Sequence, residues 1–189
     1  MTSVSLPSQT KYDRVAIAIH WITAALMIFM VFFGEELMET GERGENEGIA
    51  STFLPSLHVN IGIIILLLTV VRVLWRVINP PPPLPATMAP WEVMITKIVH
   101  AAFYVLMIGL PLTGWFAFGE FVEEHSAMAG VRLLGLVDMP ASPGGGDFAG
   151  DIHEVGSKIA MVLIILHVVA ALKHQFINRD GLLRRMSPH

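Results

Sequence analysis

The chain has 189 residues, enough for one domain, and 53% of them are hydrophobic while only 15% are charged. A soluble domain carries about 25% charged residues, so this composition and the mean hydropathy of +0.62 predict an integral membrane protein. The net charge of −4 offers no basic surface for nucleic acid, and the absence of cysteine excludes disulfides, thiolate catalysis, iron–sulfur clusters and thioether-attached haem.

Four apolar segments are each long enough, at about 20 residues, to cross a bilayer. They span residues 15–34, 56–78, 95–118 and 152–177. Lipid offers no hydrogen-bond partner to an open strand edge, so we expect all four to be helices. The first segment is too long for a typical signal peptide and no small-residue cleavage site follows it, which favours a retained helix. The sequence therefore predicts an all-α fold, a four-helix transmembrane bundle forming a single domain over residues 1–189.

Basic residues are distributed unevenly between the two sides of the predicted bundle. The loop at residues 35–57 and the loop at residues 119–151 each hold one basic residue and six acidic residues. Nine of the twelve basic residues gather toward the other side: Lys11, Arg14, Arg72, Arg76, Lys97, Lys173, Arg179, Arg184 and Arg185. The positive-inside rule therefore predicts that both termini and the second loop are cytoplasmic.

Every predicted helix contains at least one histidine. These are His20, His58, His100, His153, His167 and His174. An ionisable side chain inside a membrane is rare and indicates a functional site, although a single histidine can also simply hydrogen-bond between helices. His153 and His167 are 14 residues apart, which is about 21 Å along a helix and close to four full turns. One helix thus presents two imidazoles on one face, near opposite membrane surfaces.

The depth of each histidine in the membrane predicts its partner. His20, near the cytoplasmic start of the first helix, matches His167, and His58, near the outer start of the second helix, matches His153. Each pair comes from two different helices, as required to hold a flat macrocycle between axial imidazoles. Zinc would need three or four clustered ligands. The pattern therefore favours two bis-histidine haem groups, with these four histidines binding the iron.

Several motifs surround these histidines in a particular order. They are AIHW at His20, LHVNIG at His58, IVHAAFYVLMIGLPLTGW in the third segment, IHEVGSKIA at His153 and ILHVVAALKHQF at His167. Together with the LLRRM tail, they make the chain resemble the bacterial cytochrome b561 family, whose members include superoxide oxidases. The resemblance implies a four-helix cytochrome with two haem b groups in the bacterial inner membrane. It also implies electron exchange with quinone and the same histidine pairing.

Other polar residues are candidates for binding the haem edges or a quinone. Arg72 and Arg76, four residues apart, could hold haem propionates in a guanidinium fork, or could anchor the helix at the membrane surface. Lys158 could neutralise an outer propionate or extend to the aqueous surface. His174 and His100 could hydrogen-bond a ubiquinone carbonyl or carry its protons, or could be ordinary interfacial histidines.

The chain contains no nucleophile–base set, phosphate loop or hydride-cofactor motif, so we expect haem to carry the chemistry. The favoured function is electron transfer between a periplasmic donor, such as superoxide, and the ubiquinone pool. One alternative is a cytochrome subunit serving a protein partner such as a dehydrogenase, hydrogenase or soluble cytochrome. Another is a membrane protein that carries metal ions without redox chemistry. Twelve acidic and two basic residues in the outer loops disfavour steering of an anion such as superoxide, whereas the family resemblance favours it.

Overall fold

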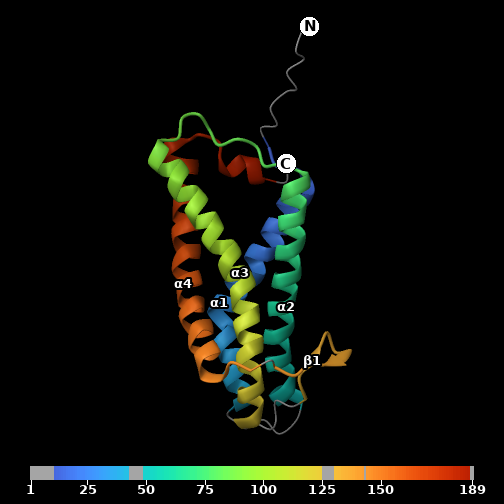
Figure 1. Cartoon of the computed structure of the whole chain (residues 1–189). Helices are drawn as coiled ribbons and strands as arrows, with labels where there is room; N and C mark the ends of the chain where they lie inside the picture. Colours follow the sequence, from blue (N-terminus) through green and yellow to red (C-terminus); the bar gives the residue numbers. More distant parts are fainter. Residues whose placement is uncertain (1–10, 43–48, 125–129, 143, 188–189) are drawn as a thin grey trace.

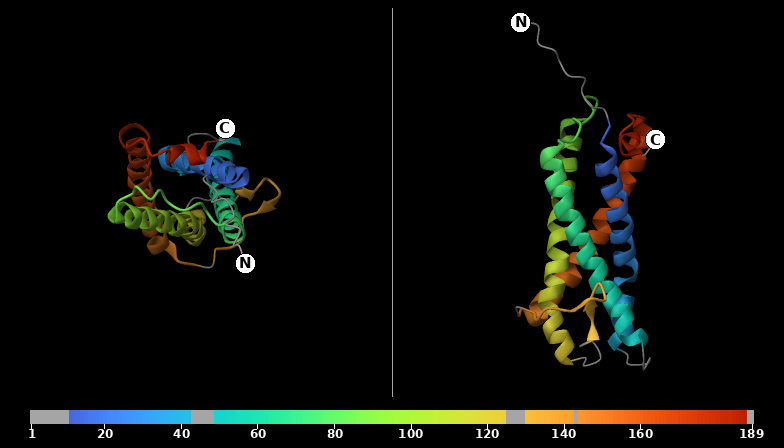
Figure 2. Two further views of the ribbon diagram at one scale, coloured as in Figure 1. Left: turned by 90° about the horizontal axis from the view of Figure 1, so that it is seen from above. Right: turned by 90° about the vertical axis from the view of Figure 1, so that its right-hand side faces the viewer.

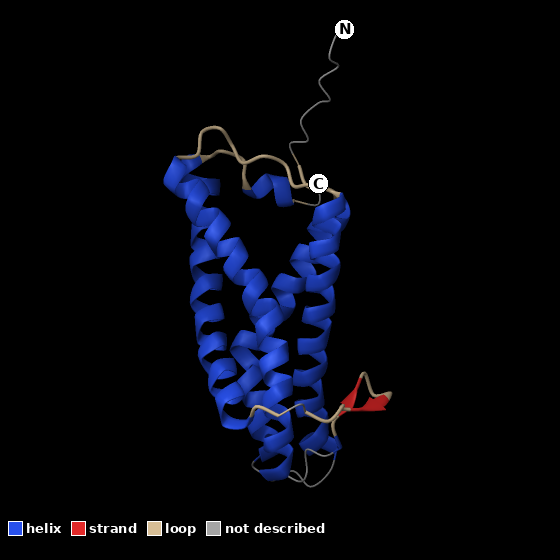
Figure 3. Ribbon diagram, viewed as in Figure 1, coloured by secondary structure: helices blue, strands red, loops and turns tan. Residues whose placement is uncertain are grey.

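The computed structural model describes residues 11–42, 49–124, 130–142 and 144–187. Four long helices run up and down the molecule (Figures 1 and 3): α1 (Arg14–Glu42), α2 (Ile49–Ile78), α3 (Pro90–Glu124) and α4 (Gly146–Lys173). A π-helical turn, His174–Asn178, continues α4, and a short 3-10 turn, Leu183–Met186, follows. Between α3 and α4 lies an antiparallel hairpin of β1 (Arg132–Leu133) and β2 (Val137–Asp138).

The two ends of the bundle hold different parts of the chain. The first and last described residues lie at one end with the α2–α3 connection, residues 79–89, and we call this the terminal end (Figure 1). The N–H of Tyr12 there donates to the carbonyl of Arg185 over 3.2 Å. The α3–α4 connection, with its hairpin, lies at the opposite end, which we call the loop end. This topology agrees with the four predicted antiparallel segments.

All four helices are long and apolar enough to cross a membrane, over Arg14–Glu39, Phe53–Ile78, Pro90–Glu120 and Gly146–Asn178. All four helices begin before the apolar segments that predicted them, and α1 and α3 also end after them. The reason is that hydropathy reports contact with lipid, whereas charged residues such as glutamate are good helix formers and continue a helix into water. In contrast, α2 ends at the predicted residue, and α4 gives way to the π-helical turn four residues before its predicted end. The four predicted helices are therefore confirmed and most of their predicted ends were too short, whereas the short β1–β2 hairpin was not predicted.

Side chains at the terminal end cap the start of α1 and tie it to the end of α2. The Asp13 carboxylate accepts hydrogen bonds from the N–H groups of Val15 and Ala16, each over 3.0 Å, and so caps α1. The same oxygen accepts the indole N–H of Trp75 over 3.0 Å, which ties the start of α1 to the end of α2. Burial of Asp13 acts to raise its pKa, but these hydrogen bonds outweigh burial and lower the pKa below its usual value.

The core is a layer of apolar side chains halfway along the bundle. Its buried members are Met27, Ile61, Ile65, Met107 and Ala160, which come from all four helices. Packing is closest within the pairs α1–α2 and α3–α4, and these pairs lie on opposite sides of the bundle when it is viewed from above (Figure 2). Many large apolar side chains on the outer faces are exposed, as expected for a multi-pass protein surrounded by lipid.

Candidate functional site

The loop-end pair consists of His58 on α2 and His153 on α4, whose ring centroids are 6.0 Å apart. Each Nδ1 atom lies 2.9 Å from a backbone carbonyl oxygen, that of Gly34 for His58 and that of Leu110 for His153. A carbonyl oxygen can only accept a hydrogen bond, so each Nδ1 must carry the proton and donate it. The lone pair of each Nε2 is then available for a metal ion.

Two glycines make room for these rings. A Cβ atom on Gly114 would lie 3.1 Å from two atoms of the His153 ring, and one on Gly34 would lie 3.3 Å from the His58 ring. Both distances are tighter than ordinary van der Waals contact. Gly109, also on α3, would place a Cβ with no atom within 4 Å. Only the first two glycines are therefore required by the position of an imidazole.

A cavity of about 530 Å³ adjoins the loop-end pair, and both His58 and His153 line it. Its other walls are largely apolar and include Met27 and Met107. A Cβ on Gly62, which also lines the cavity, would meet no atom within 4 Å, so there is space beside α2 at this depth. The volume lies within the range of about 300–1,000 Å³ that small-molecule and cofactor sites occupy.

Acidic side chains also line this cavity. They are Glu35, Glu39 and Glu154. Glu154 forms an ion pair with Lys158 over 2.5 Å, one helical turn along α4, and both side chains are mostly exposed. Lys158, a predicted propionate ligand, is thus already engaged by a neighbouring carboxylate.

The terminal-end pair consists of His20 on α1 and His167 on α4, with ring centroids 6.4 Å apart. The rings of His100 and Phe103, both on α3, lie 5.8 Å and 5.4 Å from His167. The guanidinium of Arg72 donates a hydrogen bond to Nδ1 of His20 over 3.2 Å, because arginine has no acceptor. This pair therefore lies beside a fixed positive charge. A neutral His20 ring whose Nδ1 accepts carries its proton on Nε2, so Nε2 could bind a metal ion only after Arg72 leaves Nδ1 and the proton shifts to that nitrogen.

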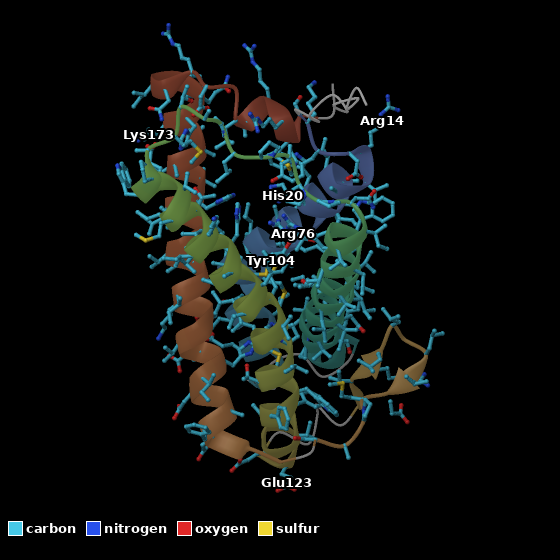
Figure 4. The ribbon with its side chains drawn as sticks, turned by 45° about the horizontal axis from the view of Figure 1, so that its top comes forward. Arg14, His20, Arg76, Tyr104, Glu123 and Lys173 are labelled. Atoms are coloured by element: carbon cyan, nitrogen blue, oxygen red, sulfur yellow. The ribbon has the colours of Figure 1, made fainter. Side chains whose placement is uncertain are left out.

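Arg72 is the predicted cation that contacts a histidine pair directly. Its guanidinium also lies 5.8 Å from the ring centroid of Tyr104, within the range of a cation–π contact. Figure 4 labels His20, Arg76 and Tyr104 in this half of the molecule. Arg76, one turn beyond Arg72 on α2, is exposed.

The spacing within both pairs fits one metal ion held between two imidazoles. A metal–nitrogen bond of about 2 Å on each side, with about 1 Å from nitrogen to ring centroid, gives a centroid separation of about 6 Å. The observed separations are 6.0 Å and 6.4 Å. At the loop end, the two free Nε2 atoms and the adjoining, largely apolar cavity fit haem, which binds two nitrogen ligands. At the terminal end, the ring separation fits haem. Within the described residues, no group of three or more His, Asp or Glu side chains is arranged to hold a metal ion.

The two residues predicted to bind quinone have different surroundings. His100 lies beside the terminal-end pair, whereas His174 is buried and its Nδ1 lies 2.5 Å from a carboxylate oxygen of Asp180. The side-chain amide of Asn178 lies 3.2 Å from the same nitrogen. His174 begins the π-helical turn, a departure from α-helix geometry that is frequent at functional sites.

The surroundings of His174 are polar. Lys173 forms an ion pair with Glu92 over 2.8 Å and lies 5.5 Å from the ring centroid of Trp91. A second cavity, of about 330 Å³, is lined by Thr87, Met88, Glu92, Asn178 and Asp180. Lys173, which precedes His174 in the sequence, is therefore already paired with a carboxylate.

Sequence reasoning missed Gly34, Gly114 and Asp180. The glycines lie on helices that supply no ligand to the loop-end pair, so a search for small residues beside the histidines could not find them. Matching depth between helices could have found Gly34, since the end of the first segment and His58 at the start of the second lie at the same level. Asp180 lies beyond the last apolar segment, where nothing in the hydropathy pattern indicates that the chain turns back.

Comparisons with known proteins place this geometry in context. Residues 11–189 match a sequence family described as prokaryotic cytochrome b561. The chain is 32% identical to cytochrome b561 homolog 2 of Escherichia coli over 93% of this chain and 90% of that protein. It is 28% identical to the probable superoxide oxidase CybB of Yersinia pestis, over 94% and 96%, and 26% identical to cytochrome b562 of Cereibacter sphaeroides, over 96% and 98%.

The contact between Asp180 and His174 predicts a pH dependence of the C-terminal segment. Burial acts to raise the pKa of Asp180, but hydrogen bonds from the N–H of Leu182 and from His174 outweigh burial and lower the pKa below 3.8. A carboxyl with a lowered pKa stabilises the fold above its usual pKa, and loses that effect as pH falls through the folded-state value. We expect Asp180→Asn to lower the local stability of residues 174–187 by about 1–3 kcal/mol at pH 6.

Hydrogen exchange of these amides, in wild type and variant, measures the effect. The difference should shrink below about pH 4, as the wild-type carboxylate becomes protonated. Asp147→Asn, which changes an exposed carboxylate at the loop end, is the control and should leave the segment unchanged. An Asp180→Asn difference that is the same at pH 3 and pH 6 would contradict this account.

Proposed function

The chain belongs to the prokaryotic cytochrome b561 family, and from this premise we propose that it transfers electrons between a donor at the loop end and ubiquinone at the terminal end. Membership makes it an inner-membrane electron-transfer protein with haem b. Its two histidine levels, 14 residues apart on α4, carry the proposal, because they suit two redox groups at different depths. The terminal end, rich in Lys and Arg, faces the cytoplasm in this proposal.

We assign the haem ligands by level. His58 and His153 would hold one haem, with support from their ring separation. His20 and His167, at the same depth on different helices, would hold the other. Haem supplies an iron that gains and loses single electrons, and two histidine ligands leave it no open position for a substrate. The carbonyls of Gly34 and Leu110 orient the loop-end imidazoles and make them stronger ligands.

The charges beside the two pairs support a direction of electron flow. Arg72 lies against the terminal-end pair, where a positive charge stabilises an added electron and can also neutralise a propionate. Carboxylates, among them Glu35, line the cavity at the loop end, where their negative charge makes an added electron less stable. Electrons are therefore more stable at the terminal end, and the flow runs from the loop end toward it.

Ubiquinone reduction needs two protons as well as two electrons, so its site must meet water. We place this site at the terminal end with His174 as its polar contact and His100 as the second candidate. His174 lies seven residues beyond His167 on α4 and is buried against Asp180, which gives it a carboxylate that can pass a proton. His100 lies closer to the terminal-end pair.

A second candidate function has a specific observation in its favour. The acidic residues that line the loop-end cavity, and the twelve acidic loop residues in the sequence, repel an anionic donor such as superoxide and attract a basic protein. The chain would then be the cytochrome component that serves a redox protein. The similarity to a probable superoxide oxidase supports the first candidate.

The ionic-strength dependence of haem reduction separates the two donors. Superoxide should reduce the protein more slowly at low salt than at high salt, because an acidic face repels it less when its charges are screened. A basic protein donor should show the opposite trend. Stopped-flow mixing of the oxidised protein with each donor, followed by a ubiquinone analogue, measures both steps. If neither donor reduces the haem, or if the quinone analogue does not reoxidise it, the proposed function is wrong.

Substitutions of the four proposed ligands should fall into two classes. His20→Ala and His167→Ala should remove the same redox component, since both ligate the terminal-end haem, and His58→Ala and His153→Ala should remove the other. Each should lower the haem absorbance by about half. Redox titration of the four purified variants identifies the lost component. The assignment fails if His20→Ala and His153→Ala remove the same one.

Gly114→Ala tests the fit of the His153 imidazole without removing a ligand. The added Cβ would press on the ring at 3.1 Å. Since the hydrogen bond from His153 to Leu110 orients that ring, displacement should lower affinity for the loop-end haem by about 10-fold or more. Gly109→Ala on the same helix adds a methyl group in open space and should have no effect. Equal haem affinity in the two variants, measured by haem titration of the apoprotein, would exclude this role for Gly114.

His174→Ala tests the proposed quinone contact. Loss of one polar partner, worth about 1–3 kcal/mol, should slow haem reoxidation by a ubiquinone analogue roughly 10-fold while both haem spectra stay intact. His100→Ala, measured in the same way, shows whether the second candidate contributes. Unchanged reoxidation in His174→Ala over a range of quinone concentrations would remove His174 from the site.

A further inference from the structure

The β1–β2 hairpin at the loop end is fixed at its base. Val131, which precedes β1, is almost fully buried against Phe118 and its neighbours. The side chain of Asn60 on α2 donates to the carbonyl of Arg132 over 3.0 Å and accepts from the N–H of Leu134 over 2.6 Å. The hairpin is therefore held in a defined position against α2.

Its turn has an apolar surface that the chain leaves uncovered. Leu134, Leu136 and Val137 are 57%, 74% and 57% exposed. The charged side chains of the hairpin, Arg132 and Asp138, form an ion pair over 3.1 Å at the strands and so cancel each other. A neutral turn of large apolar side chains gains nothing from water and suits an apolar environment.

Several backbone groups of the turn have hydrogen-bond partners within the protein. The carbonyl of Leu133 accepts the N–H of Leu136 over 2.9 Å, and the carbonyl of Leu136 accepts the guanidinium of Arg132 over 3.0 Å. Asn60 satisfies the N–H of Leu134. Lipid requires polar backbone groups to find partners within the protein, because an unpaired group costs several kcal/mol there.

The hairpin is attached to α2 at a residue inside the membrane-spanning segment. Asn60 lies seven residues inside the span that begins at Phe53, which is about 10 Å along α2. The hairpin projects outward from the side of α2, with its turn directed toward the terminal end rather than toward the loop end (Figures 1 and 2). It is thus continuous with the outward, lipid-facing surface of α2, on which Leu67 is 56% exposed.

We propose that the β1–β2 hairpin inserts its apolar turn, Leu134–Val137, into the lipid leaflet at the loop end as an interfacial anchor beside α2. The occupant of this surface is the acyl chain and glycerol region of the bilayer. The hairpin fixes how deep the loop end sits in the membrane. A second copy of the chain and a soluble partner are the competing occupants.

Spin labelling tests this proposal directly, because the chain has no cysteine to remove. Leu136→Cys and Leu134→Cys are each labelled with a nitroxide in the haem-loaded protein, reconstituted in phosphatidylethanolamine–phosphatidylglycerol bilayers. Leu67→Cys, on the lipid-facing surface of α2, is the lipid control. Glu123→Cys, exposed at the loop end beyond the span of α3 (Figure 4), is the water control. An unchanged haem spectrum confirms that each variant is folded.

The measured quantity is the ratio of collision rates with molecular oxygen, which concentrates in lipid, and with a water-soluble nickel chelate. We expect both hairpin labels to have a ratio several-fold above that of Glu123→Cys and close to that of Leu67→Cys. A ratio equal to that of Glu123→Cys would place the turn in water and overturn the proposal. Protection from both reagents, with dipolar broadening between labels, would indicate a second copy on this surface and would also overturn it.

Discussion

One face of α4 sets the arrangement of the whole bundle. His153, Ala160, His167 and His174 follow one another at intervals of seven residues, and seven residues are close to two helical turns. Ala160 is fully buried at the midpoint, within the apolar core layer. The neighbouring helices must therefore place a histidine opposite α4 at two levels and apolar side chains at the level between these two.

The two histidine levels differ in what holds their rings. At the loop end, backbone carbonyls accept the Nδ1 protons of His58 and His153, and glycines leave space for the rings. At the terminal end, Arg72 donates to His20 instead. A carbonyl acceptor increases the electron density of an imidazole, while a nearby cation favours an added negative charge. Two histidine pairs at different depths, in different surroundings, therefore give two sites with different affinities for an electron.

The sequence was sufficient to predict what depends on periodicity and depth. Hydropathy predicted the four helices, and matching depth predicted the approach of His58 to His153 and of His20 to His167, since a helix is rigid over the distance from His153 to His167. It did not predict that His100 lies closer to His167 than His20 does. The sequence was insufficient where the outcome depends on contacts between distant backbones. The packing of Gly114 on the His153 ring, the return of the chain that brings Asp180 to His174, and the docking of the hairpin on Asn60 belong to this class. None of these contacts leaves a periodic trace in the sequence.

The central claim is that one chain holds two haem b groups, each between two histidines from different helices. The most direct measurement is the haem content of the purified protein, by pyridine haemochrome assay against protein quantified by amino-acid analysis, together with low-temperature electron paramagnetic resonance of the oxidised form. The account predicts about two haem b groups per chain, both with low-spin ferric signals of bis-histidine ligation. A content of about one haem, or a high-spin signal of similar intensity to the low-spin one, would contradict it.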